Sequence, residues 1–206
     1  ESMRKYFPFA VMATLSLALA MPAATAADAE IGAPAPAFSL TDLDGQTHDL
    51  GDFAGKTVVL EWTNHECPFV VKHYDSGNIP RQQAVATAAG VVWIVINSSA
   101  PGKQGHVTAD EARRIQADWD ASQTHYLFDG DGAVGRAYGA KTTPHMYVID
   151  PDGVLRYNGA IDSIPSAKIA DLEAAEQYVE LALAELAAGQ PVSRPLTQPY
   201  GCSVKY

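Results

Sequence analysis

The chain has 206 residues and a formal net charge of −10, and 47% of its residues are hydrophobic. This composition indicates a globular protein with a sizeable core and argues against a disordered chain. The chain has 14 lysines and arginines but 24 aspartates and glutamates. This deficit of basic residues argues against nucleic acid or an anionic membrane as a binding partner. Only two cysteines are present, Cys67 and Cys202.

Residues 1–26 have the pattern of a secretory signal peptide. Two basic residues precede an apolar run, and an Ala-Thr-Ala triplet at residues 24–26 offers a cleavage site. A membrane-spanning helix takes about 20 apolar residues, and this run is shorter. We therefore expect cleavage, a periplasmic or secreted protein, and no stable membrane insertion afterwards. Glu1 and Ser2 precede the first methionine and indicate a cloning remnant.

Residues 27–189 predict one α/β domain, because buried strands alternate with helical patterns. The alternation implies a parallel sheet with helices on both faces, extended by antiparallel strands at one edge. Residues 190–206 contain three prolines and predict an extended tail. In chain order we first expect a β-hairpin around Asp44-Gly45, a strand at 56–63 and a helix from Pro68 to about Ala89 that is broken near Gly77 and Pro80. A strand at 91–97 follows, and then a helix that is capped by Thr108 and Glu111 and runs to about Ser122. The last expected elements are a strand at 125–129, a turn and short helix within 130–140, a strand pair over 145–161 and a helix over 166–188.

Cys67 stands where the first central strand gives way to a helix. Chemistry in open α/β sheets gathers at the carboxyl ends of the strands. The free N–H groups and partial positive charge of a helix N-terminus stabilise a thiolate, so we expect a lowered pKa and a reactive thiol at Cys67. Pro68 fits the first helical position, where its missing N–H is not needed. The alternative is a small cysteine packed inertly in the core.

A second motif, Thr142-Thr143-Pro144-His145, directly precedes a buried strand. A proline there cannot donate to the ladder, so it requires a special turn or a cis bond, unless it is an ordinary strand-entry proline.

Together these segments resemble the thioredoxin superfamily. The resemblance rests on "VVLEWT", on "CPFV" and on "TTPHMYVIDPDG". The hairpin "FSLTDLDGQTHDLGDFAGK" is similar to the N-terminal element of the exported redoxin (AhpC/TSA, peroxiredoxin-like) branch. The resemblance to the superfamily covers about residues 31–188. It implies a thioredoxin-like α/β fold with a central mixed sheet, a cis Pro144 whose loop faces Cys67, and thiol–disulfide or peroxide chemistry. No cofactor is expected.

The sequence departs from both named activities of that superfamily. Thioredoxins use Cys-x-x-Cys, and Val70 occupies the second cysteine position here. Peroxiredoxins place Thr or Ser three residues before the reactive cysteine, where this chain has Asn64. Asn64 can donate and accept hydrogen bonds and remains a candidate site residue, although the peroxide-binding pattern is not met.

Cys202 is the only partner for Cys67 within the chain. The tail could fold back across the domain, so that Cys202 resolves the intermediate formed on Cys67. Alternatively, a permanent Cys67–Cys202 disulfide pins the tail, or Cys202 pairs with another subunit.

His65 and His145 are expected near the Cys67 sulfur if the superfamily geometry holds. A protonated imidazole would lower the thiol pKa, and a neutral one could move a proton. Cys67, His65 and His145 also offer an alternative soft metal site for copper or zinc. Glu61, in an otherwise apolar strand, is a candidate proton acceptor.

We therefore expect a thiol-dependent oxidoreductase, either a thiol–disulfide enzyme or a peroxiredoxin-like antioxidant. The Cys67 thiolate would attack a disulfide or peroxide of a protein or small molecule, Cys202 would resolve the product, and an external thiol would reduce the pair. The alternatives are a metal-binding module and a non-catalytic binding module with a structural disulfide.

Overall fold

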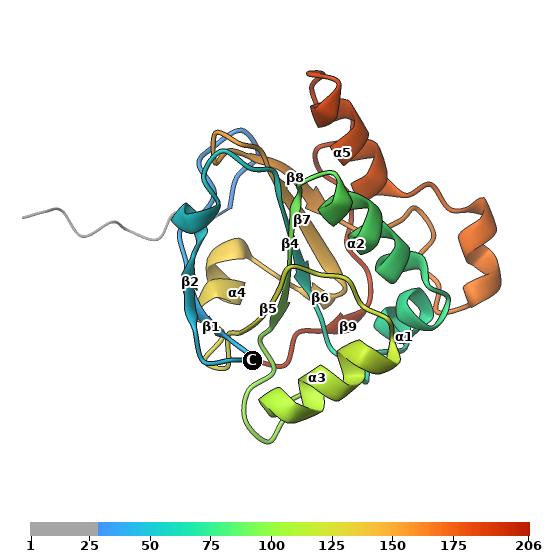
Figure 1. Ribbon diagram of the computed structural model, residues 1–206. Helices are drawn as coiled ribbons and strands as arrows, with labels where there is room; N and C mark the ends of the chain where they lie inside the picture. The colour runs from blue at the N-terminus through green and yellow to red at the C-terminus, as the bar shows by residue number, and fades with distance from the viewer. Residues whose placement is uncertain (1–28) are drawn as a thin grey trace, which may run out of the picture.

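The computed structural model describes residues 29–206, so the predicted signal peptide lies outside the described residues. A seven-stranded mixed sheet with strand order β2-β1-β5-β4-β3-β7-β8 forms the centre (Figure 1). Strands β3, β4 and β5 are parallel to one another, and the hairpins β1–β2 and β7–β8 add antiparallel strands at the two edges. The strands are β1 Ser39–Asp42, β2 Thr47–Asp49, β3 Val58–Trp62, β4 Val92–Asn97, β5 His125–Phe128, β7 His145–Ile149 and β8 Leu155–Gly159; a separate pair consists of β6 Thr142–Thr143 and β9 Cys202–Ser203.

Helices cover both faces of the sheet, as the sequence predicts. One face packs against α1, α2, α3 and α5, and the other packs against α4 and the 3-10 helix η1. Strands β3 and β4 are buried along their whole length, which explains why their sequences are continuous apolar runs. The helices are η1 Leu50–Phe53, α1 Pro68–Asp75, α2 Asn78–Ala88, α3 Ala109–Asp118, α4 Ala133–Tyr138, η2 Ile169–Ala174 and α5 Tyr178–Ala187.

Most elements lie where the sequence predicts them. The break between α1 and α2 falls at Gly77, which has a φ of 72°, and Pro80 lies inside the first turn of α2. The capping box between Thr108 and Glu111 opens α3. That helix is shorter than predicted: it ends at Asp118, and Asp120 has a φ of 50°, in the left-handed region, through which a right-handed helix cannot continue.

The single helix predicted over 166–188 is wrong. The chain forms η2, then extended backbone at residues 175–177, then α5. The interruption has a tertiary cause, since Ser163 exchanges hydrogen bonds with Glu176 and Asp162 bridges Gln177. These contacts use backbone groups that a continuous helix would need.

The tail predicted at residues 190–206 is extended and runs back from α5 across the end of the sheet to β6 (Figure 1). None of the helices within residues 29–206 is long and apolar enough to cross a membrane.

Candidate functional site

Cys67 occupies the N-cap position of α1, five residues beyond the end of β3. Its backbone is extended, with φ −81° and ψ 120°, and its side chain is fully buried. The loop between strand and helix is held by Asn64. The Cys67 N–H donates to the Asn64 carbonyl at 3.0 Å, and the Asn64 side chain accepts from the Glu66 N–H at 2.9 Å and donates to the Gln104 carbonyl at 3.3 Å. Asn64 thus fixes where α1 begins.

A second loop supports the first. The Gly105 N–H donates to the Glu66 carboxylate at 2.6 Å, and Gly105 lies directly against the Asn64 amide. A Cβ at position 105 would approach the Asn64 side chain to 2.3 Å, and the backbone there has a φ of +83°. Only glycine satisfies both conditions without a shift of the Cys67 loop.

The loop before β7 faces Cys67. The Thr143–Pro144 peptide bond is cis, and the Cys67 Sγ lies 3.0 Å from the Thr143 carbonyl oxygen. Both the cis bond and the approach of this loop to the cysteine were implied by the superfamily resemblance, and both are confirmed.

The tail brings Cys202 to the same place. Strand β9 pairs with β6 so that Cys202 lies opposite Thr143, and the Cys202 N–H donates to the Cys67 Sγ at 3.4 Å. The tail therefore lies back across the domain to Cys67, which is one of the arrangements that the sequence left open. Both cysteines are present as thiols.

The two thiols differ in acidity because of their surroundings. Burial by itself raises the pKa of Cys67, but hydrogen bonds from the Cys202 side chain and from the backbone N–H groups of Val70 and Cys202 outweigh it and hold this pKa below the ordinary value of 9.0. Burial and the contact with Cys67 raise the pKa of Cys202 to about 11. The contact of the sulfur with the Thr143 carbonyl belongs to the protonated thiol, because a carbonyl can only accept. Cys67 is thus the more acidic thiol of the pair.

A buried polar cluster anchors the tail two residues before Cys202. The Tyr200 hydroxyl donates to Asp162 at 2.5 Å, and Lys72 of α1 donates to Asp162 and to Tyr200, each at 3.3 Å. The side chains of Lys72 and Asp162 have no exposed surface. His73 completes the cluster at 3.2 Å from the Tyr200 hydroxyl, and burial together with Lys72 lowers its pKa to about 3, so it is neutral. This cluster was not predicted from the sequence, where its only signal is a Lys-His pair in the helix after Cys67.

A second anchor lies earlier in the tail. The Thr197 hydroxyl accepts from the Ala160 N–H at 2.9 Å and shares a hydrogen bond of 2.6 Å with Tyr157, both on or beside β8. Backbone hydrogen bonds between Asn158 and the chain at 195–197 add to it. The approach to Cys202 is therefore fixed over several residues.

His145 lies elsewhere than expected. Its ring donates from Nε2 to Asn158 at 2.9 Å, and Nδ1 accepts from the Lys141 N–H at 3.2 Å. Burial lowers its pKa to about 4 despite the Asn158 hydrogen bond, so the ring is neutral. Since side chains alternate along β7, His145 points away from the face on which Met146 packs with Cys67. What His145 does contact is the chain leading into the Thr143–Pro144 bond.

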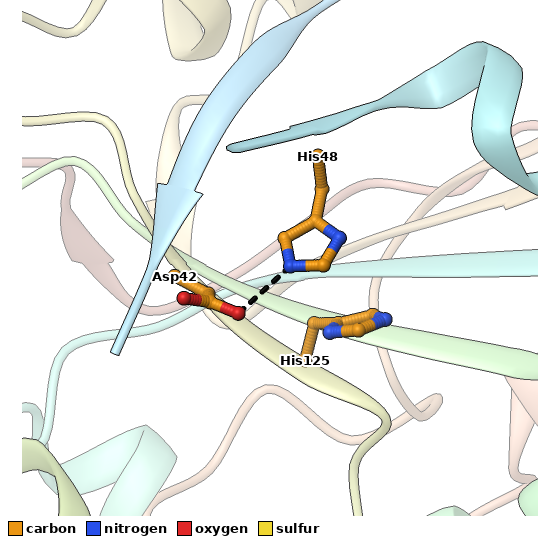
Figure 2. Close-up of side chains that lie close together, drawn as sticks. All are labelled: Asp42, His48 and His125. Atoms are coloured by element: carbon orange, nitrogen blue, oxygen red, sulfur yellow. Dashed lines mark hydrogen bonds and ion pairs between the residues drawn. The ribbon is translucent and has the colours of Figure 1, made fainter. Parts of the chain in front are cut away.

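The alternative metal ligands do not converge either. His65 is partly exposed in the loop before Cys67, and His145 is turned to the other face of the sheet. Within residues 29–206, the one group of three metal-ligating side chains with mutually close ligand atoms is Asp42, His48 and His125, at another place (Figure 2).

Glu61 is fully buried on β3. Its carboxylate accepts hydrogen bonds from the Tyr74 hydroxyl at 2.8 Å, from the Trp93 indole at 2.8 Å and from the Gln83 amide at 3.3 Å. Burial nevertheless dominates and raises the pKa to about 7. Tyr74 lies on α1, so Glu61 is linked to the helix that begins at Cys67.

This arrangement agrees with the comparisons to known proteins. The sequence matches the Redoxin family over residues 30–175. The chain belongs to the Redoxin family. The curated protein MauD of Paracoccus versutus, a methylamine utilization protein, is 25% identical over 130 residues, which are 63% of this chain and 58% of MauD. The redoxin described here therefore spans less than two thirds of that relative.

Solved structures show the same fold. An uncharacterized conserved protein from Geobacillus kaustophilus is 26% identical with a TM-score of 0.71, covering 86% of this redoxin and 92% of that chain. A putative thiol:disulfide interchange protein DsbE from Chlorobium tepidum is 24% identical with a TM-score of 0.52, covering 64% and 85%. The predicted thioredoxin-like fold is thereby confirmed.

Proposed function

We propose that this redoxin is an exported thiol–disulfide oxidoreductase whose redox pair is Cys67 and Cys202. The supporting observation is the direct contact between them: the Cys202 N–H lies 3.4 Å from a Cys67 sulfur whose pKa is lowered at a helix N-terminus. A thiolate next to a second thiol is the arrangement that thiol–disulfide exchange requires.

The proposed reaction has two exchanges. The Cys67 thiolate attacks one sulfur of a substrate disulfide, forms a mixed disulfide and releases the other sulfur as a thiolate. Cys202 then loses its proton to the released thiolate or to water and attacks the Cys67 sulfur, which forms the Cys67–Cys202 disulfide and expels the second substrate thiolate. The substrate gains two electrons and the cysteine pair loses two. An external thiol donor restores the pair by the reverse exchanges.

Access to the sulfur requires motion of the tail. Cys67 is fully buried, and β9 covers it by pairing with β6. A substrate sulfur can reach Cys67 only when β9 leaves β6. This opening also breaks the hydrogen bonds of residues 204–206 to Ala100, Ala140 and Lys141, while the anchors at Tyr200 and Thr197 hold. The tail in this account both shields the thiolate and returns Cys202 after the first exchange.

The hydrogen bonds of the Asn64 side chain favour disulfide chemistry over peroxide chemistry. Both polar groups of its amide are engaged with the loops around Cys67, so neither is directed at a bound peroxide. We assign Asn64 and His145 as positioning residues. Asn64 sets the Cys67 loop, and His145 holds the segment leading to Thr143 and Pro144.

The test is to trap the mixed disulfide. The reduced full chain carrying Cys202→Ser is mixed with oxidised glutathione and analysed by intact mass. Accumulation of one glutathione on Cys67, with no such adduct in the wild-type chain, supports the proposal. The wild-type chain should instead lose two hydrogens by forming its internal disulfide. A parallel reaction with hydrogen peroxide tests the antioxidant alternative, for which the variant would gain oxygen at Cys67 faster than it gains glutathione.

A non-catalytic binding module is the second candidate, favoured by the extensive anchoring of the tail. In that case a Cys67–Cys202 disulfide would be a permanent link, and the Cys202→Ser chain would react with oxidised glutathione no faster than an ordinary buried thiol.

A further inference from the structure

Three side chains that the redox chemistry does not use meet at one edge of the sheet. Asp42 ends β1, His48 lies in β2 and His125 begins β5 (Figure 2). The register explains why they meet. His48 lies opposite Leu40, two residues from Asp42, and His125 lies opposite Ile94. Leu40 and Ile94 belong to the same core cluster, so all three polar side chains project from the same face.

The cluster lies far from the thiols along the strands. Cys67 follows the carboxyl end of β3, whereas His125 stands at the amino end of the parallel strand β5. Nothing in the redox mechanism places polar groups at this end of the sheet.

Hydrogen bonds to one oxygen of the Asp42 carboxylate orient the other oxygen toward His48. Its Oδ1 accepts the backbone N–H groups of Asp44 and Gln46 at 2.8 and 2.9 Å, so the hairpin turn fixes its orientation. Its Oδ2 is directed at His48 Nε2 at 2.7 Å. Hydrogen bonds that orient a ligating carboxylate from behind are a regular feature of metal sites.

The two imidazoles complete the donor set. The His48 and His125 rings lie 4.2 Å apart between centroids, and Phe53 packs against His125 at 5.5 Å. Within residues 29–206, neither ring nitrogen of His125 takes part in a hydrogen bond, although the residue is partly buried. A partly buried imidazole with both nitrogens unused, beside a second imidazole and a carboxylate, is suited to bind a cation.

We propose that Asp42, His48 and His125 form a binding site for a divalent first-row transition metal such as Zn²⁺. One ligand atom from each residue lies within 4.8 Å of the others. Tetrahedral Zn²⁺ with bonds of about 2.0–2.1 Å places its ligand atoms about 3.3 Å apart, so small side-chain rotations suffice. Binding would replace the proton between His48 and Asp42 with the metal. Two nitrogens and one oxygen suit Zn²⁺ or Cu²⁺ and do not suit Mg²⁺ or Ca²⁺, which take oxygen ligands.

The site would leave one coordination position for water, and it would link both strands of the N-terminal hairpin to β5. Occupancy therefore ties the sheet edge together independently of the thiols.

The test is a Zn²⁺ titration against a chromophoric chelator, with the untagged full chain in which Cys67→Ser and Cys202→Ser remove the thiolate ligands. We expect one equivalent of Zn²⁺ to bind and excess Mg²⁺ not to displace it. His48→Ala or His125→Ala should weaken binding more than about 100-fold, because removal of a direct ligand exceeds the effect of removing an outer-shell partner. His65→Ala, near the thiols, is the matched control and should leave binding unchanged.

Ring-nitrogen NMR of the same thiol-free chain, with His48 and His125 intact, guards against variants that fail to fold. Saturating Zn²⁺ should shift the His48 and His125 signals and leave the His65 and His145 signals in place. Absence of Zn²⁺ binding, retention of binding in the His125→Ala chain, or unmoved His48 and His125 signals at saturation would overturn the proposal.

Discussion

Replacement of the buried Glu61 by glutamine should change how stability depends on pH. The pKa of Glu61 is raised from its ordinary value of 4.5 to about 7, with burial as the main cause. Below pH 4.5 the carboxyl is protonated in both the folded and the unfolded chain. Between pH 4.5 and 7 the unfolded chain loses the proton while the folded chain keeps it, so the free energy of unfolding falls as the pH rises. Above pH 7 both states are ionised and the loss is complete.

The size of this change in the free energy of unfolding follows from the difference between the two pKa values of Glu61. Each pH unit corresponds to about 1.4 kcal/mol, so ionisation of Glu61 lowers the free energy of unfolding by about 3 kcal/mol at pH 8 relative to pH 4.5. Glutamine mimics the protonated carboxyl. Trp93, Gln83 and Tyr74 surround the Glu61 carboxyl. The glutamine oxygen can accept hydrogen bonds from Trp93 and Gln83, and the glutamine amide can donate to the Tyr74 oxygen.

The assay is urea unfolding at pH 5, 6, 7 and 8. Cys67→Ser and Cys202→Ser are present in both chains, so that thiol ionisation does not contribute. His73 and His145, whose pKa values are lowered by burial, affect both chains alike and cancel in the difference. The Glu61→Gln chain should gain stability relative to its parent steadily from pH 5 to pH 7 and level off by pH 8. A difference that does not vary with pH would refute the assignment of a protonated carboxyl at Glu61.

Two further substitutions test the supports of the site. Lys72→Met should lower the free energy of unfolding by about 3–5 kcal/mol, because it removes the buried cation that pairs with Asp162 in the core. Adding Asp162→Asn should recover part of this loss in urea unfolding, and no recovery would contradict the pairing. Gly105→Ala should destabilise the chain more than Gly102→Ala by about 1–3 kcal/mol, since both have positive φ but only Gly105 abuts Asn64. Equal thermal unfolding of these two variants would show that the contact with Asn64 does not matter.

The elements that the sequence predicts well have local causes. The Asp44-Gly45 turn, the Thr108–Glu111 capping box and the continuous apolar runs of β3 and β4 carry their signals within a few residues. The interruption between η2 and α5 has no such signal. It depends on hydrogen bonds between Ser163 and Glu176, so helical periodicity alone predicts a continuous helix.

The candidate site divides in the same way. The place of Cys67 at a strand-to-helix turn could be inferred from residues next to it. The cluster of Lys72, Asp162 and Tyr200 joins positions 90 and 128 residues apart, and a single sequence gives no information on such pairs. The orientation of His145 depends on strand alternation, which places Met146 and not His145 on the face of Cys67.

A redox titration of the full chain shows whether Cys67 and Cys202 are a working redox pair. Thiols are trapped by alkylation across a series of glutathione potentials, with the Cys67→Ser and Cys202→Ser chains as controls. We expect a single two-electron transition with a midpoint above about −300 mV, absent from both variants. A Cys67–Cys202 disulfide that persists below about −300 mV, or thiols that never pair, would contradict it.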